Sequence, residues 1–243
     1  MEHDNNRFRS VTVFLLATNE VNSLRDTVVQ ILDKCCWDDI ERIVIVLKDS
    51  ACASAAVAVE LSETFDKVEA YVQTAKSLHY LMKELADMAQ QGSHFLIMSS
   101  DGEMDTNSLA QLIEQAKLKP QAIICASKWM KGSTVHGYRT IHEICSRCAN
   151  SAVSLISGVK GKDICSLFQI YPISVYRRTA FSKPHDLYYE WILLPVKNGA
   201  AYYEIPTVFN KRTEGRSNCT WRFLFELGFG YVRHAIRIRF KNT

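Results

Sequence analysis

Short apolar runs alternate with amphipathic stretches through the first half of the chain. Five runs of five to seven residues end in polar turns and predict strands: Val11–Ala17, Arg42–Leu47, Val68–Val72, Phe95–Ser99 and Ala122–Ala126. Apolar positions at helical spacing predict helices between them: one that Asn22 or Ser23 would cap, then Ala53–Phe65, Leu78–Gln90 and Asn107–Ala116. This alternation indicates βαβ units, and therefore an α/β fold with a mostly parallel central sheet flanked by helices.

The second half of the chain is less regular. Residues Tyr138–Gly158 predict a long helix, residues near Tyr188–Val196 predict another helix, and Ala200–Pro206 predict the last strand. No linker rich in Pro, Gly or Ser interrupts the chain, and no internal repeat is visible. We therefore expect a single domain over residues 9–210 and a distinct C-terminal segment, 211–243.

Composition narrows the class of protein only slightly. The 243 residues are 47% hydrophobic and 23% charged, which is typical of a globular domain, and the net charge of +3 gives no reason to expect a nucleic-acid partner. The polar N-terminus does not resemble a signal peptide, and no apolar run reaches the roughly 18 residues that span a bilayer. We therefore expect a cytoplasmic chain with reduced cysteines, in solution or at the inner face of a membrane.

The C-terminal segment 211–243 is basic and rich in aromatic residues. It carries eight Lys or Arg against two Glu, and Phe, Tyr and Trp alternate with Arg from Trp221 onward. This make-up is typical of an amphipathic helix that lies on anionic lipid. It is equally typical of a C-terminal helix that packs on its own domain and leaves its bases in water, so both interpretations stay open.

An acidic cluster follows the strand that ends at Ser99. Asp101, Glu103 and Asp105 crowd the point where this strand emerges, which indicates either a solvated turn or a cation site. In parallel sheets, ligands bind outside the carboxyl ends of the strands. Polar residues also follow the first two strands, namely Thr18, Asn19 and Glu20, then Lys48, Asp49 and Ser50. The sequence therefore predicts a binding crevice along this edge.

Seven motifs, in chain order, carry a family resemblance. They are LLATNEVNSLRDTV, RIVIVLKDSACAS, FLIMSSDGEMD, ASKWMKGS, RTIHEICSRCAN, KDICSLFQIYPISVYR and YEIPTVFNKRTEGRS. Their order and spacing resemble those of family 2 glycosyltransferases with the GT-A fold, in particular the polyprenyl-phosphate (dolichol-phosphate mannosyltransferase-like) branch. The resemblance spans about Val11 to Ser217. It implies inverting transfer of a sugar from a nucleotide-diphosphate sugar to a polyprenyl phosphate or a saccharide hydroxyl, with Mg²⁺ or Mn²⁺.

The resemblance also implies roles for individual residues. Metal ligands would be Ser99, Asp101 and Glu103, with Asp101 also catalytic. Donor-binding residues would be Thr18, Asn19, Glu20, Asp49, Lys128, Arg212 and Ser217, and acceptor-phosphate residues would be Arg139, Ser146 and Arg147. A phosphate acceptor needs no general base, whereas a hydroxyl acceptor needs a carboxylate, for which Asp163 and Glu190 are the candidates.

Two departures from the family pattern leave an alternative open. Ser99 stands in place of an Asp, and Leu47 and Lys48 stand where the family has two Asp residues. A non-catalytic GT-A domain that acts as a binding or regulatory subunit is therefore the second hypothesis. A nucleotidyltransferase is disfavoured because the turn after the first strand lacks the glycine-rich, lysine-containing loop expected there.

Overall fold

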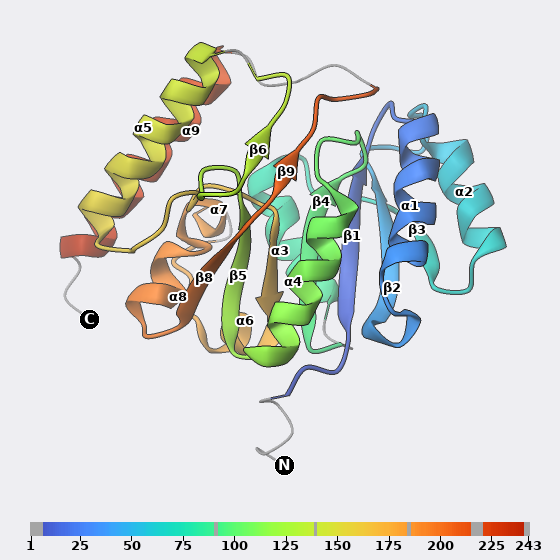
Figure 1. Ribbon diagram of the computed structural model, residues 1–243, viewed down its shortest axis with the longest axis horizontal. Coiled ribbons are helices and arrows are strands. Elements are labelled where there is room, and N and C mark those ends of the chain that lie inside the picture. The colour runs from blue at the N-terminus through green and yellow to red at the C-terminus, as the bar shows by residue number, and fades with distance from the viewer. Residues whose placement is uncertain (1–6, 90–91, 139, 184–185, 215–220, 241–243) are drawn as a thin grey trace.

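Among the residues that the structure describes, the central sheet has seven strands, one of which is antiparallel to its neighbours. The computed structural model describes residues 7–89, 92–138, 140–183, 186–214 and 221–240. The strand order is β3 (Val68–Val72), β2 (Ile40–Leu47), β1 (Val11–Ala17), β4 (His94–Ser99), β7 (Gln169–Pro172), β5 (Ala122–Ser127) and β8 (Ala201–Pro206). Only β7 runs against its neighbours in this sheet. The expected α/β architecture with a mostly parallel sheet is confirmed (Figure 1).

Helices cover both faces of the sheet. They are α1 (Asn22–Lys34), α2 (Ala55–Thr64), α3 (Leu78–Met88), α4 (Thr106–Leu118), α5 (Thr140–Ser157), α6 (Ile173–Arg178), α7 (Leu187–Glu190), α8 (Leu193–Lys197) and α9 (Trp221–Phe240), with a 3₁₀ turn at Trp37–Asp39. Because side chains alternate along a strand, β1 contributes to two cores. Its Val13 and Leu15 pack with α1, α2 and α4, whereas Phe14 packs with α3, α7 and α9. None of the described helices is long and apolar enough to cross a membrane.

A two-stranded ribbon and the segment after it lie over the carboxyl ends of the parallel strands. The ribbon pairs β6 (Thr134–Val135) with β9 (Val208–Phe209). From β9 the chain crosses toward β1 and α1, at the upper right of Figure 1. We call residues 207–214 the crossing segment. It brings side chains that are far apart in sequence to the predicted binding edge.

One local expectation at the start of α1 is wrong. Neither Asn22 nor Ser23 is the N-cap, because the helix begins after Val21 and both residues lie in its first turn. The carboxylate of Glu214, from the crossing segment, accepts hydrogen bonds from the backbone N–H groups of Val21 and Ser23 at 2.8 and 2.9 Å. These bonds hold the pKa of Glu214 below its ordinary value. A distant carboxylate thus satisfies the helix donors that a local side chain was expected to satisfy.

Candidate active site

The turn after β1 is organised around a buried carboxylate. The backbone N–H groups of Thr18 and Asn19 both donate to Oε2 of Glu20, at 2.7 and 2.9 Å. The Ser54 hydroxyl donates to the carbonyl of Glu20 at 2.7 Å. Glu20 therefore stabilises the conformation of this turn. Of Thr18, Asn19 and Glu20, Asn19 is the exposed residue.

Asp101 follows the end of β4, and its carboxylate has partners from three residues. Its Oδ1 accepts hydrogen bonds from the Ser99 hydroxyl at 2.6 Å and from the Glu103 backbone N–H at 3.0 Å. Gly102 makes the turn between the two acids with φ +79°, a conformation that L side chains rarely adopt. A Cβ at Gly102 would also lie 2.8 Å from the Thr213 hydroxyl, which itself donates to the Asp101 carbonyl at 3.1 Å. Glycine is thus required for the crossing segment to close over Asp101.

Arg212 joins the two carboxylates. Its Nη2 lies 2.8 Å from Oδ2 of Asp101 and 3.1 Å from Oε2 of Glu103. Burial and the neighbouring charge of Asp101 raise the pKa of Glu103, and the guanidinium only partly opposes them. Two carboxylate oxygens therefore converge on one point, and a cation of the protein itself occupies that point.

The residues at this point fit a divalent cation that arrives with a diphosphate. Mg²⁺ is usually held by one or two carboxylates together with substrate phosphates and water. Asp101 and Glu103 supply the two carboxylates, and the Ser99 hydroxyl is the adjacent oxygen. In the described part of the chain, no group of three or more His, Cys, Asp or Glu is placed to hold a metal ion. Binding there requires that the Arg212 guanidinium leave its present position.

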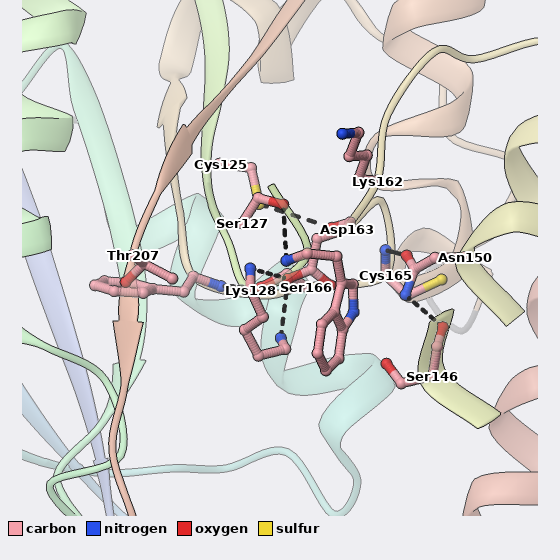
Figure 2. A network of polar contacts seen from close by, with 12 residues as sticks. Cys125, Ser127, Lys128, Ser146, Asn150, Lys162, Asp163, Cys165, Ser166 and Thr207 are labelled. Atoms are coloured by element: carbon pink, nitrogen blue, oxygen red, sulfur yellow. Dashed lines mark hydrogen bonds and ion pairs between the residues drawn. The ribbon is translucent and has the colours of Figure 1, made fainter. Parts of the chain in front are cut away.

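A second ion pair lies beyond β5 and is sealed. The Lys128 ammonium is 3.1 Å from Oδ2 of Asp163, and their side chains are 13% and 2% exposed (Figure 2). The same oxygen accepts the Lys128 backbone N–H at 2.8 Å, and the Asp163 N–H donates to Glu204 at 2.7 Å. Burial lowers the pKa of Lys128, but the charge and hydrogen bond of Asp163, together with neighbouring groups such as Tyr138, more than offset burial, so the pKa is raised. We call Lys128 and Asp163 the sealed pair.

Aromatic rings and α5 surround the sealed pair. The Lys128 ammonium lies 5.2 Å from the ring centre of Phe209, which is in the crossing segment. On the other side, the Arg147 guanidinium lies 4.4 Å from the ring centre of Trp129 and pairs with Glu143 at 2.9 Å. The backbone of Ser146 accepts a hydrogen bond from Asn150 (Figure 2). The ring centre of Trp129 thus lies 6.0 Å from the Lys128 ammonium and 4.4 Å from the Arg147 guanidinium, and the binding roles of these two bases stay predictions.

The crossing segment connects the sealed pair to the carboxylates. Phe209 contacts Lys128, the Asn210 N–H donates to the Glu103 carbonyl at 2.8 Å, and Arg212 pairs with Asp101. Sequence reasoning singled out Arg212 in this segment and missed its neighbours Thr213 and Glu214. Both stand in the TEGRS motif, but their partners, Asp101 and the start of α1, are more than a hundred residues away.

Residues after β2 do not form a carboxylate site. Leu47 is 2% exposed and belongs to the apolar core, whereas Lys48 is exposed. Asp49 is also exposed, and its side chain accepts the Ala51 N–H at 3.0 Å within a turn. The structure gives no indication that a second pair of acids replaces the two Asp residues of the family pattern here.

Glu190, the last residue of α7, lies near helix α9. Its carboxylate accepts hydrogen bonds from the N–H and hydroxyl of Ser182 at 2.9 and 2.8 Å. Two basic groups of α9 are near it, His234 Nδ1 at 3.8 Å and Arg237 Nη1 at 4.0 Å. Burial would raise the pKa of Glu190, but these polar partners lower it. Of the remaining predicted residues, Arg139 and Ser217 lie outside the described residues.

Comparisons with known proteins establish the fold class. No protein-family model matches the chain, and no curated protein matches it. The chain is similar to the crystal structure of glucosyl-3-phosphoglycerate synthase from Mycobacterium tuberculosis in complex with Mn²⁺, UDP and phosphoglyceric acid. The TM-score is 0.64 at 10% identity, over 97% of this chain and 80% of that chain. The same enzyme with Mg²⁺ and UDP gives a TM-score of 0.61 at 11% identity, over 95% and 79% of the two chains.

A third structure, described only as a mycobacterial protein, gives a TM-score of 0.64 at 10% identity, over 95% of this chain and 74% of that one. At such identities the likeness concerns the fold. The chain has the fold of GT-A glycosyltransferases, and the two structures of glucosyl-3-phosphoglycerate synthase named above contain UDP with Mn²⁺ or Mg²⁺.

Proposed function

We propose that the protein is a metal-dependent glycosyltransferase that uses a nucleotide-diphosphate sugar and inverts the anomeric centre. The observation that carries the proposal is the convergence of Asp101 and Glu103 on a single cation position at the carboxyl end of β4. Mg²⁺ or Mn²⁺ at this position would neutralise the diphosphate leaving group. UDP is the nucleotide to test first, because the solved neighbours contain it.

The protein's own residues have separable tasks in this proposal. Asp101 and Glu103, with the Ser99 hydroxyl, hold the cation. Arg212, once released from the carboxylates, is within reach of the diphosphate, whose oxygens are good acceptors for a guanidinium. The turn of Thr18, Asn19 and Glu20, together with Asp49 and Ser217, completes the donor side, a role that rests on the family resemblance.

The acceptor side of the proposal centres on α5. Arg139, Ser146 and Arg147 would bind the phosphate of a polyprenyl phosphate. Such an acceptor is already ionised and needs no general base. With a saccharide hydroxyl as acceptor, Asp163 or Glu190 would take the proton, although both are engaged, by Lys128 and by Ser182. These engagements favour the phosphate acceptor.

The proposal divides the chain into a transferase domain, residues 9–210, and a C-terminal segment, 211–243, that provides peripheral membrane contact. The second candidate function is a non-catalytic GT-A domain. Its specific support is that both cationic side chains of the site are already neutralised, Arg212 by Asp101 and Lys128 by Asp163.

The test is a calorimetric titration with UDP, GDP, dTDP and CDP, each with and without Mn²⁺. We expect metal-dependent binding of one nucleotide, weakened at least about tenfold in Asp101→Asn because the variant keeps the shape but loses the charge. Asp66→Asn, which removes an exposed acid outside the site, is the matched control. A folded protein that binds none of the four nucleotides would support the non-catalytic domain instead.

A further inference from the structure

The two faces of helix α9 differ in exposure to solvent. One face is buried against the body of the protein through Tyr231, His234, Ala235 and Ile238. The opposite face exposes large apolar side chains: Phe225 at 75%, Phe229 at 72%, Ile236 at 46% and Phe240 at 77%. The spacings of four and seven residues place these four on one stripe of the helix. We call it the outer stripe. Packing of this segment on its own domain is thus confirmed for one face, and the lipid interpretation stays a prediction for the opposite face.

Arginines border the outer stripe. At about 100° per residue, Arg233 lies along one edge of the stripe and Arg239 along the other. Both are exposed. Long basic side chains can extend their charged ends past an apolar surface while their stems cover its rim. Three phenyl rings between two arginines therefore form a surface with an apolar centre and positive edges.

Helix α5, the neighbour of α9, also exposes large apolar side chains. It packs alongside α9, and Figure 1 shows the two helices together at one end of the molecule. Its buried residues are Asn150 and Val153, whereas Ile141, Ile144 and Leu155 are 50%, 51% and 83% exposed. Large exposed apolar side chains gathered on two adjacent helices are typical of a surface that binds a partner.

We propose that the outer stripe of α9, together with the exposed apolar residues of α5, docks onto an anionic lipid surface. Aromatic and aliphatic residues bordered by arginine suit the headgroup region of such a surface. A second copy of the chain is a poorer occupant, because a symmetric contact would bring Arg233 and Arg239 of two copies together. The described part of α9 carries a single acid, Glu226, to offset them.

Docking would also orient the candidate active site. The guanidinium of Arg147 in α5 lies over the ring of Trp129, so a lipid held by α5 would bring its phosphate to Arg147. The docking surface names the residues and the lipid partner of the membrane contact in the proposed function, and the orientation rests on the proposed transferase activity. A protein that binds vesicles but no nucleotide would refute the transferase and leave the docking surface standing.

The test is co-sedimentation of the full chain with vesicles of phosphatidylcholine alone or with one third phosphatidylglycerol. We expect binding only to the anionic vesicles, decreasing as salt is raised. The double variant Phe225→Ser/Phe229→Ser should bind at least about tenfold more weakly, because two phenyl rings no longer enter the bilayer. Leu118→Ser, at a 73% exposed apolar position of α4, is the matched control and should bind as the parent does.

A charge variant tests the arginines separately. Arg233→Gln and Arg239→Gln should each weaken binding to anionic vesicles about fivefold, in accordance with the attraction of one basic residue to such a surface. Equal binding to neutral vesicles, or no effect of the phenylalanine variant, would overturn the proposal. So would a dimer, seen by light scattering, that the phenylalanine variant abolishes, because a second copy would then cover the surface.

Discussion

The two ion-paired centres of the molecule use similar groups but differ in stoichiometry and in access to solvent. At the end of β4, two carboxylates share one guanidinium, and the side chains of Arg212 and Glu103 are 25% and 24% exposed. In the sealed pair, one ammonium meets one carboxylate, and Asp163 is only 2% exposed. The same crossing segment contacts both centres, through Arg212 and Phe209.

This difference indicates that the Arg212 guanidinium can be exchanged for another cation, whereas the Lys128 ammonium is fixed in place. Asp101 and Glu103 together carry more negative charge than Arg212 neutralises, so a divalent cation is a better match for them. Asp163 already has an ammonium and a backbone N–H on one oxygen, and its removal would strand a largely buried charge. The first centre is therefore suited to ligand binding, and the second to holding β5 and the loop around Asp163 in place.

The largest expected effect comes from breaking the sealed pair. Asp163→Ala should lower the free energy of unfolding by about 3–5 kcal/mol, because Lys128 loses its counter-ion in a poorly hydrated position. Urea denaturation measures the change. The double variant Asp163→Ala/Lys128→Met should recover part of the loss, since no charge is then left unpaired. A single variant within about 1 kcal/mol of the parent would mean that the pair behaves as an exposed one.

An intermediate effect is expected from removing the guanidinium of Arg212. Arg212→Ala should raise the affinity for Mn²⁺ alone about tenfold, because the guanidinium no longer competes for the two carboxylates. Titration of free Mn²⁺ by electron paramagnetic resonance measures this without any nucleotide. Lys211→Ala removes the neighbouring exposed charge and is the control. An equal rise in both variants would indicate a general electrostatic effect rather than competition at one position.

The smallest expected effect is a pH dependence of the affinity for Mn²⁺. The pKa of Glu103 is raised by burial and by Asp101, so the carboxylate becomes protonated at a higher pH than an exposed Glu. Mn²⁺ binds the ionised form, and its affinity should therefore fall severalfold as pH decreases through this raised pKa. Mn²⁺ titrations between neutral and weakly acidic pH measure the change. Glu103→Gln should bind more weakly at neutral pH and lose most of the dependence; a profile unchanged in this variant would assign the titration to another group.

Several elements were predictable because their signals are local. The bounds of β1 and β3 agree with the apolar runs that predicted them, and β4 ends at Ser99 as expected. Strand β7 was not predicted: it contributes four residues, and it is buried between β4 and β5 by pairings that no local pattern expresses. The predicted helix near Tyr188 is present as two short helices, α7 and α8.

The residues of the candidate site also differ in whether a local sequence signal could predict them. Ser99, Asp101 and Glu103 could be proposed from sequence because they directly follow a buried strand, and the structure brings them together around Asp101. The contact between Arg212 and Glu103 joins residues 109 positions apart, so its geometry depends on the path of the crossing segment. Glu190 could not be located from sequence, because its neighbours belong to α9.

The sequence by itself determined most strands and helices of the first half of the chain, since the periodicity of apolar residues is a property of the local chain. It also determined that acids cluster at one strand end and that the C-terminal segment is amphipathic. Only the tertiary structure decided that Arg212 stands between Asp101 and Glu103, that Lys128 is sealed by Asp163, and which face of α9 remains exposed. The reason is physical: these properties depend on charges and surfaces that meet only when distant segments pack together.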